Sequence, residues 1–241
     1  MKSSGRRKPG RHYLQNMKIE SSPNCTKCEL YEQAEHPGIP THQHSASSPG
    51  DPVLLVIGQN PGFHEDKTNE SFVGRSGKIL KSSYLGGLEL SDRCNIYLTN
   101  GVRCHTTNNQ TPKPRHYIEC CQWLIEDLQH LNQKYNRILI LTLGAPATTS
   151  FHKNILSKKG VSLTKSFNFN GTTYRSEDHH ISNLDEITVF STYHPAAVLR
   201  NHNYINSVHS HMQLISDCLD GTMAIPSDPQ VVATRSPKTW T

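Results

Sequence analysis

Residues 53–62 read Val53-Leu-Leu-Val-Ile-Gly-Gln-Asn-Pro-Gly62. The first five residues are apolar without polar alternation, which is typical of a strand buried on both faces of a parallel sheet. Glycine and proline then interrupt the pattern and predict a loop. This stretch therefore indicates a buried strand that delivers two amide side chains, Gln59 and Asn60, to one edge of a sheet.

Strand and helix patterns alternate through the rest of the chain. Further strands are expected at Asn95–Thr99, Arg137–Leu143 and Ile187–Tyr193. Helices are expected at Gly74–Leu88, Pro114–Tyr135, Ala145–His152 and Asn203–Leu219. Residues 36–52 are expected to be a loop, and residues 160–178 a polar hairpin or loop. The alternation predicts an α/β fold, a single three-layer α/β/α domain around a central, mostly parallel four-stranded sheet.

The two ends of the chain lack apolar periodicity. Residues 1–18 contain Pro and Gly and are predicted to form a basic disordered tail. Residues 222–241 are predicted to form a second disordered tail. The predicted folded domain therefore spans residues 19–221.

The net charge of +5 at pH 7 is distributed unevenly. Residues 1–18 carry six Lys and Arg and no acidic residue, which leaves 19 basic and 20 acidic residues in the remainder. A cationic arm on a near-neutral body suits salt-sensitive contact with DNA, but a solvated tail without a partner explains the charge equally well. No apolar run is long enough to span a membrane, so no membrane partner is expected.

Cysteine usage suggests a metal centre. Seven cysteines, one Cys-x-x-Cys pair and no secretory signal favour metal binding and free thiols in an intracellular protein. Thiolates select zinc or an iron–sulphur cluster, and spacing alone leaves both open. Cys121 falls on the apolar stripe of its helix and is expected to fill the core. The candidate ligands are Cys25, Cys28, Cys104 and Cys120.

Polar residues follow the carboxyl ends of the expected strands, where ligands bind in open α/β sheets. Residues 58–62 follow the first strand, Asn100 the second, Gly144 the third and His194 the fourth. A carboxylate pair, a Ser-His-Asp triad and a phosphate-binding Gly-rich loop are missing from this set. Amides and an imidazole suit recognition of a planar, amide-like group such as a nucleobase, and the imidazole can stabilise developing negative charge.

Three sequence blocks resemble motifs of the uracil-DNA glycosylase superfamily. The first combines Gly58-Gln-Asn-Pro-Gly62, Glu65-Asp66 and Ser71-Phe-Val-Gly-Arg-Ser-Gly-Lys-Ile-Leu80; the others are Thr99-Asn-Gly-Val-Arg-Cys104 and Tyr193-His-Pro-Ala-Ala-Val-Leu-Arg200. They occur in the family's order, and the cysteine spacing resembles the iron–sulphur type, family 4. The resemblance implies a uracil-DNA glycosylase-like fold with a 4Fe–4S cluster on Cys25, Cys28, Cys104 and Cys120.

The resemblance implies roles for the matching residues at the uracil. Phe72 would stack on a uracil flipped out of DNA, and Asn100 would read its O4 and N3–H. His194 would hydrogen-bond O2 and stabilise the uracil anion as the glycosidic bond breaks. Backbone N–H groups around Gly58 and Gln59 would help hold the base.

DNA contacts are implied as well. Val198, Leu199 and Arg200 would enter or brace the space left by the flipped nucleotide, and the loop at Pro61 and Gly62 would contact the DNA. The cluster would take no redox part in hydrolysis. It would pin residues 103–111 against DNA.

The first motif departs from family 4, which usually reads Gly-Glu-Ala-Pro-Gly where this chain has Gln59 and Asn60. An amide orients water but is a poor base, so Asn60 would position the attacking water without deprotonating it. This change leaves other deaminated or mismatched bases open as substrates. Ser71 replaces the usual proline, and Ala196 replaces the serine after His-Pro. Relatives that form a covalent adduct carry a basic insertion, ending in histidine, after the Asn motif. In this chain His105 follows Cys104 directly without such an insertion, so no covalent adduct is expected.

Each of these residues has a simpler interpretation when taken alone. Phe72 could be an aromatic residue of the core, Asn100 a turn-forming residue and His194 a cap at the end of a strand. Glu65 and Asp66 are expected only to cap the next element. Four histidines could suggest a zinc site, namely His42, His44, His64 and His105. Their spacing fits no common zinc-binding pattern, which disfavours that site.

The sequence therefore predicts a monofunctional DNA glycosylase that flips uracil from DNA and hydrolyses its N-glycosidic bond to leave an abasic site. No lysine matches a Schiff-base position, so no lyase activity is expected. The expected partner is DNA containing uracil or another damaged base, and the expected protein is an intracellular monomer. A catalytically inactive module that binds damaged DNA is the alternative from a different class.

Overall fold

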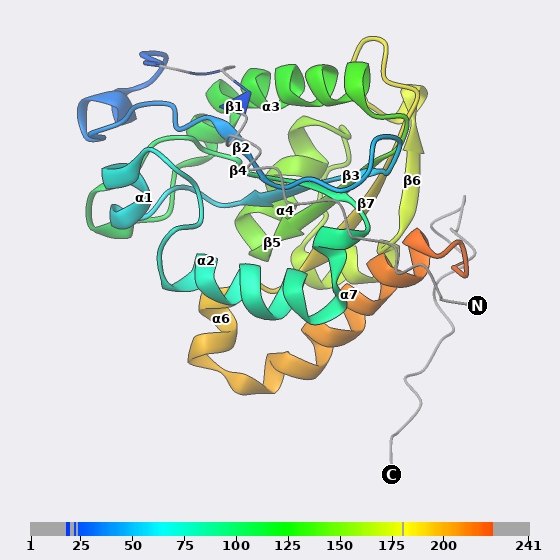
Figure 1. The fold of residues 1–241 in the computed structure, drawn as a ribbon. Helices are drawn as coiled ribbons and strands as arrows, with labels where there is room; N and C mark the ends of the chain where they lie inside the picture. The colour runs from blue at the N-terminus through cyan, green and yellow to red at the C-terminus, as the bar shows by residue number, and fades with distance from the viewer. Residues whose placement is uncertain (1–17, 20–21, 23, 180, 224–241) are drawn as a thin grey trace, which may run out of the picture.

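A computed structural model describes residues 18–19, 22, 24–179 and 181–223. Its centre is a seven-stranded sheet in the order β1-β2-β4-β3-β5-β7-β6 (Figure 1). The strands are β1 Lys18–Ile19, β2 Thr41–Ser45, β3 Val53–Gly58, β4 Asn95–Asn100, β5 Ile138–Leu143, β6 Thr172–Arg175 and β7 Glu186–Thr192. The rest of the predicted tails, residues 1–17 and 224–241, lies outside the described residues.

The four inner strands confirm the predicted parallel core. β4, β3, β5 and β7 pair in parallel, and Gly58 at the end of β3 stands opposite Asn100 at the end of β4. The predicted count of four strands is wrong, because antiparallel strands extend both edges. β2 and β6 carry mainly polar and Thr side chains, so neither shows the apolar pattern that reveals a buried strand. Lys18 was predicted to belong to the tail, but it lies in β1 and pairs with His42 of β2.

Helices cover both faces of the sheet, with α3 on one side and α2, α6 and α7 on the other (Figure 1). Their bounds are α1 Phe63–Thr68, α2 Arg75–Ile79, α3 Pro114–Lys134, α4 Gly144–Asn154, α5 Leu163–Ser166, α6 Pro195–Arg200 and α7 Ile205–Leu219. The single helix predicted at 74–88 is three pieces, because α2 passes into a π-helical segment at Leu80–Leu85 and a 3₁₀ turn at Gly86–Leu88. Within the described residues, none of the helices has the length and apolar character needed to cross a membrane.

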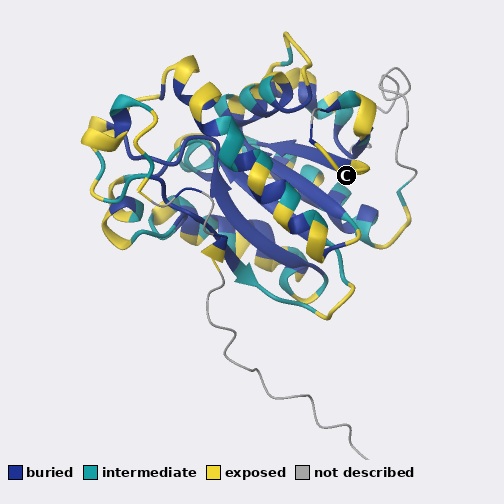
Figure 2. Cartoon of the chain, turned by 90° about the horizontal axis from the view of Figure 1, so that it is seen from above, coloured by how far each residue is buried: buried dark blue, intermediate teal, exposed yellow. Residues whose placement is uncertain are grey.

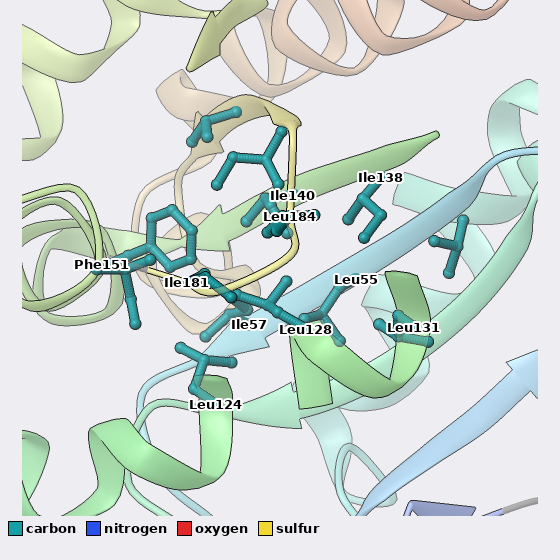
Figure 3. Close-up of a cluster of buried hydrophobic side chains, with 14 of the residues drawn as sticks. Leu55, Ile57, Leu124, Leu128, Leu131, Ile138, Ile140, Phe151, Ile181 and Leu184 are labelled. Carbon is teal, nitrogen blue, oxygen red and sulfur yellow. The ribbon is translucent and has the colours of Figure 1, made fainter. Parts of the chain in front are cut away.

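The first core lies between the sheet and α3 with α4. Leu55 and Ile57 point from β3 toward Leu124 and Leu128 of α3 and Phe151 of α4 (Figure 3). Cys121 packs at the edge of this cluster, which confirms its predicted place on the apolar stripe. Burial of these apolar side chains stabilises the fold by about 1.5–3 kcal/mol for each one that is fully enclosed.

The second core lies on the opposite face of the same strands. Leu54 and Val56 alternate with the residues of the first core and pack among side chains of the α2 region and α7, including Leu80 and Met212. Figure 2 shows the inner strands as the most buried part of the molecule. β3 is therefore apolar throughout because each of its faces meets a layer of helices.

A buried ion pair joins the loop after β4 to α3. Arg103 and Asp127 contact each other, with their side chains 1% and 0% exposed. Arg103 also donates to the Ser22 hydroxyl over 2.9 Å and to the Trp123 carbonyl over 3.3 Å, while Thr41 donates to Asp127. The Arg103 guanidinium is thus held in the interior, where it cannot contact DNA directly.

Asp127→Ala is expected to lower the free energy of unfolding by about 3–5 kcal/mol, because it leaves the buried guanidinium without its carboxylate. Urea unfolding followed by circular dichroism measures the loss. Asp178→Ala is the matched control, since the Lys158–Asp178 pair is 45% and 32% exposed and such pairs contribute about 0–1 kcal/mol. Equal losses in the two variants would contradict the assigned role of the buried pair.

Candidate active site

A cleft of about 540 Å³ opens at the carboxyl ends of the parallel strands. Eight of the residues singled out from the sequence line it: Gln59, Asn60, Pro61, Gly62, Phe72, Asn100, His194 and Arg200. Gly58 lies directly beneath, at the end of β3. Val198 lines a neighbouring apolar groove of about 260 Å³ instead, and Leu199 is half-buried on α6.

The floor of the cleft forms where β3 and β4 end. The two strands stay joined beyond their last pairs, because the N–H groups of Gly101 and Val102 donate to the carbonyls of Gly58 and Gln59 over 2.9 and 3.0 Å. A Cβ atom on Gly58 would lie 2.5 Å from Asn100 Oδ1 and 2.6 Å from Phe72 Cζ. Glycine is therefore required at position 58 for the amide and the phenyl ring to meet.

Asn100 is buried and its orientation is supported by a neighbour. Its Nδ2 donates to the Ser71 hydroxyl over 3.1 Å, and Ser71 is itself buried. One N–H and the carbonyl oxygen of the amide remain for a ligand. Ser71, which departs from the family's usual proline, thus contributes a contact that a proline side chain could not.

Phe72 has a strained backbone. Its φ of 61° lies in the left-handed region, where a bulky residue is an outlier and strain often marks functional sites. Gly77 in α2 approaches so closely that a Cβ there would lie 1.9 Å from the Phe72 carbonyl oxygen. The carboxylate of Glu65 accepts from Gly74 N–H over 2.7 Å and braces the same loop. Packing therefore holds the phenyl ring at the floor of the cleft.

His194 is the imidazole of the cleft and the N-cap of α6. Its Nδ1 accepts from Ala196 N–H over 3.1 Å, so the ring proton resides on Nε2. Burial, together with the Arg200 charge, lowers the pKa of His194 to about 4, although Glu65 acts in the opposite direction. The histidine is consequently neutral at pH 7, with one N–H available to donate. Gly144, at φ 80°, leaves room beside the His194 Cβ.

Asn60 is tied to the loop that follows Cys104. Its Nδ2 donates to the Thr106 hydroxyl over 3.2 Å and to the Pro61 carbonyl over 3.1 Å. His105 Nδ1 donates to the same carbonyl over 3.1 Å. With its nitrogen engaged, the carbonyl oxygen of Asn60 is the atom suited to accept a hydrogen bond from water.

Two acidic residues of the first motif have different environments. Asp66 is buried and accepts from the backbone N–H groups of Glu35 and His36, each over 2.9 Å. Glu65 lines the cleft and holds Gly74 as described above. The expectation that both only cap the next element missed these contacts.

The four candidate cysteine ligands gather beside α3. Each of the thiols of Cys104 and Cys120 lies within electrostatic reach of the other three, and Gly38 N–H donates to Cys104 Sγ over 3.3 Å. Cys28, Cys104 and Cys120 share one small cluster with Leu30 and Val102. These cysteines come from the N-terminal knuckle (Cys25, Cys28), the loop after β4 (Cys104) and α3 (Cys120).

Among the described residues, neither these cysteines nor other side chains form a compact site for a single metal ion. In the part of the chain that the structure describes, no group of three or more His, Cys, Asp or Glu side chains is arranged to hold a single ion. The histidine zinc site, which its spacing already disfavoured, is not formed among the described residues: His42 and His44 lie on β2, His64 lies on α1, and His105 donates to the Pro61 carbonyl. A multi-iron cluster needs one thiolate at each iron, which suits four cysteines near one another without convergence on a point.

Comparisons with known proteins agree with this geometry. The family model of the uracil DNA glycosylase superfamily matches residues 44–213. A type-4 uracil-DNA glycosylase of Sulfurisphaera tokodaii is 31% identical over 75% of this chain and 73% of its own length. The type-4 enzyme of Thermotoga maritima is 29% identical over 79% and 86% of the two chains, and that of Archaeoglobus fulgidus 28% identical over 73% and 78%. The chain thus belongs to the uracil-DNA glycosylase superfamily, with relatives of type 4.

Proposed function

We propose that this protein removes uracil from DNA by hydrolysing the N-glycosidic bond, which leaves an abasic site for base excision repair. The observation that carries the proposal is the position of His194, whose Nδ1 is occupied by the Ala196 N–H so that Nε2 carries the proton, in the same cleft as Asn100 and Phe72. A bound uracil needs a hydrogen-bond acceptor for its N3–H, a donor for its O4 and a second donor for its O2. The cleft supplies all three next to an aromatic ring.

The base is held in a defined orientation. The Asn100 oxygen accepts from uracil N3–H, and its remaining N–H donates to O4. The Phe72 ring stacks on the pyrimidine, as expected for an enzyme that reads a base outside the duplex. Backbone N–H groups around Gly58 and Gln59 complete the contacts. Val198, Leu199 and Arg200 on α6 brace the DNA from which the nucleotide has flipped, and Pro61 and Gly62 contact it at the opposite rim.

Bond cleavage leaves negative charge on the base and positive charge on the sugar. His194 Nε2–H donates to uracil O2, where charge develops, and stabilises the departing anion. Asn60 orients water toward the sugar through its carbonyl oxygen and does not need to act as a base, because an oxocarbenium-like sugar is strongly electrophilic. No lysine lines the cleft in the described part of the chain, which supports hydrolysis without lyase chemistry.

A 4Fe–4S cluster is proposed for Cys25, Cys28, Cys104 and Cys120. When bound, it supplies a structural link and no chemistry at the uracil. The four thiols connect the knuckle, α3 and the loop after β4, whose next residues hold Pro61 and Asn60. The cluster therefore supports the water-orienting side of the cleft. The protein is proposed to act as a monomer inside the cell.

His194→Ala is expected to slow single-turnover excision of uracil roughly 10²–10³-fold, equivalent to the loss of about 2–4 kcal/mol of transition-state stabilisation. An oligonucleotide with one uracil is incubated with excess protein, and alkali reveals abasic sites. His130→Ala, an exposed histidine on α3, is the matched control and should retain the wild-type rate. Excision by His194→Ala at the wild-type rate would contradict the proposal.

The same assay measures base preference when the uracil in the oligonucleotide is replaced by hypoxanthine, xanthine or a mismatched thymine.

The pH profile tests the neutral form of the same histidine. Because the pKa of His194 is lowered to about 4, the imidazole stays neutral until the pH falls through that value. The pH dependence of the excision rate should consequently show no inflection due to His194 between pH 8 and pH 5, even if other groups titrate in that range. A rate that rises on acidification with a midpoint near 6.5, the ordinary pKa of histidine, and does so only when His194 is present, would mean that the cationic form acts.

Cys120→Ser and Cys121→Ser form a matched pair for the cluster. Cys120→Ser is expected to lose bound iron and sulphide, whereas Cys121→Ser, which alters a core position, should keep both. The measurement is iron and acid-labile sulphide per chain in protein purified without oxygen, with the visible absorption spectrum. Iron retained by Cys120→Ser, or zinc found in the wild type, would overturn the assignment.

A further inference from the structure

A column of aromatic rings reaches the wall of the cleft through Tyr193 and Tyr204. Tyr193 and Tyr204 stack with centroids 4.1 Å apart and planes 15° apart. Phe167 meets Tyr193 edge-on at 5.1 Å, and His211 packs against Phe167 at 4.2 Å. The roles assigned to the uracil site use none of these rings.

The column borders the space in which DNA is proposed to bind. Tyr193 and Tyr204 line the same cleft as His194 and Arg200. Beyond the uracil floor, that cleft extends to Leu163 of α5. Its volume of about 540 Å³ falls in the range of sites for molecules larger than one pyrimidine, roughly 300–1,000 Å³. Space therefore remains beside the flipped base.

Tyr204 is the outer member of the column and is held in place from behind. It is half-buried, and among the described residues Tyr193 is the ring that stacks on it. Its backbone N–H donates to the Asn201 carbonyl, and Asn201 Oδ1 caps the same turn by accepting from Asn203 N–H over 3.1 Å. At the inner side, Tyr84 donates to the Tyr193 carbonyl over 3.0 Å. One face of Tyr204 is thus used, and the ring is preorganised.

We propose that Tyr204, supported by Tyr193, is a stacking subsite for a second, unpaired nucleobase adjacent to the flipped uracil on the same strand. This inference rests on the proposed function and specifies which form of DNA the cleft accepts. An aromatic face near a cation is the usual platform for single-stranded nucleic acid, because every base has a π face and every linkage a phosphate. Arg200, four residues before Tyr204 and in the same cleft, supplies the cation.

The subsite distinguishes single-stranded or opened DNA from an intact duplex. A neighbour in a duplex is paired and stacked on both faces, so it must leave the helix before Tyr204 can contact it. In a single strand the neighbour is already free, and stacking on a protein aromatic contributes about 1–3 kcal/mol per base. The column therefore favours uracil in unpaired DNA.

The test compares wild type, Tyr204→Ala and Tyr204→Phe on short single strands with one uracil. Matched strands carry a stable abasic residue in place of the 5′ or the 3′ neighbour of the uracil. Single-turnover excision at several protein concentrations gives the dissociation constant for each strand. Thermal unfolding of both variants checks that the fold is retained.

Removal of the neighbour on one side should raise the wild-type dissociation constant roughly 5- to 150-fold. Tyr204→Ala should raise it by a similar factor on the intact strand and show no further rise on the abasic-flanked strand. Tyr204→Phe keeps the ring and should behave like the wild type. With a paired duplex, the effect of Tyr204→Ala should be smaller.

Equal weakening by Tyr204→Ala on intact and abasic-flanked strands would overturn the subsite, because the ring would then act on the uracil or on the fold. Wild-type affinity in Tyr204→Ala would overturn it as well. Failure of the wild type to excise uracil from any strand would count against the proposed function instead. In that event, fluorescence anisotropy with the same strands and variants still tests the stacking, with the same expected pattern of dissociation constants.

Discussion

The absence of a side chain at Gly58 is the constraint on which the candidate site depends. At this position two parallel strands end side by side, and the space that a Cβ would fill is taken by the Asn100 amide and the Phe72 ring. Hydrogen-bond recognition of a planar base requires donor, acceptor and stacking surface within one small volume. A glycine at the end of a strand buried on both faces provides that volume without opening the core.

Contacts behind the cleft hold this arrangement. Glu65 and Gly77 fix the strained Phe72 loop, and the Arg103–Asp127 pair anchors the loop after β4 to α3. His194 gains its tautomer from the backbone of its own helix. Each of these candidate site residues is therefore oriented by a second contact, as preorganisation for a charge that forms only during a reaction would require.

The sequence predicted the parts of this structure that rest on periodicity and motif. The apolar run at 53–57 predicts a strand buried on both faces, and the apolar stripe through Leu124 and Leu128 predicts the buried face of its helix. The parallel core could therefore be predicted from the sequence. β2, which pairs with both β1 and β4, and the edge strand β6 were missed because their mainly polar and Thr side chains carry no apolar pattern. The left-handed Phe72 and the Tyr193–Tyr204 stack depend on tertiary packing, and no local spacing reveals them.

Excision by Gly58→Ala tests the central claim most directly. The added methyl must displace Asn100 or Phe72, and a misplacement of about 1 Å can cost roughly 10²-fold in rate. Gly87→Ala is the matched control, because nothing lies within 4 Å of a Cβ there. We predict that Gly58→Ala remains folded but excises uracil at least about 10²-fold more slowly than Gly87→Ala under single-turnover conditions. Equal rates in the two variants would contradict a uracil site formed at the ends of β3 and β4.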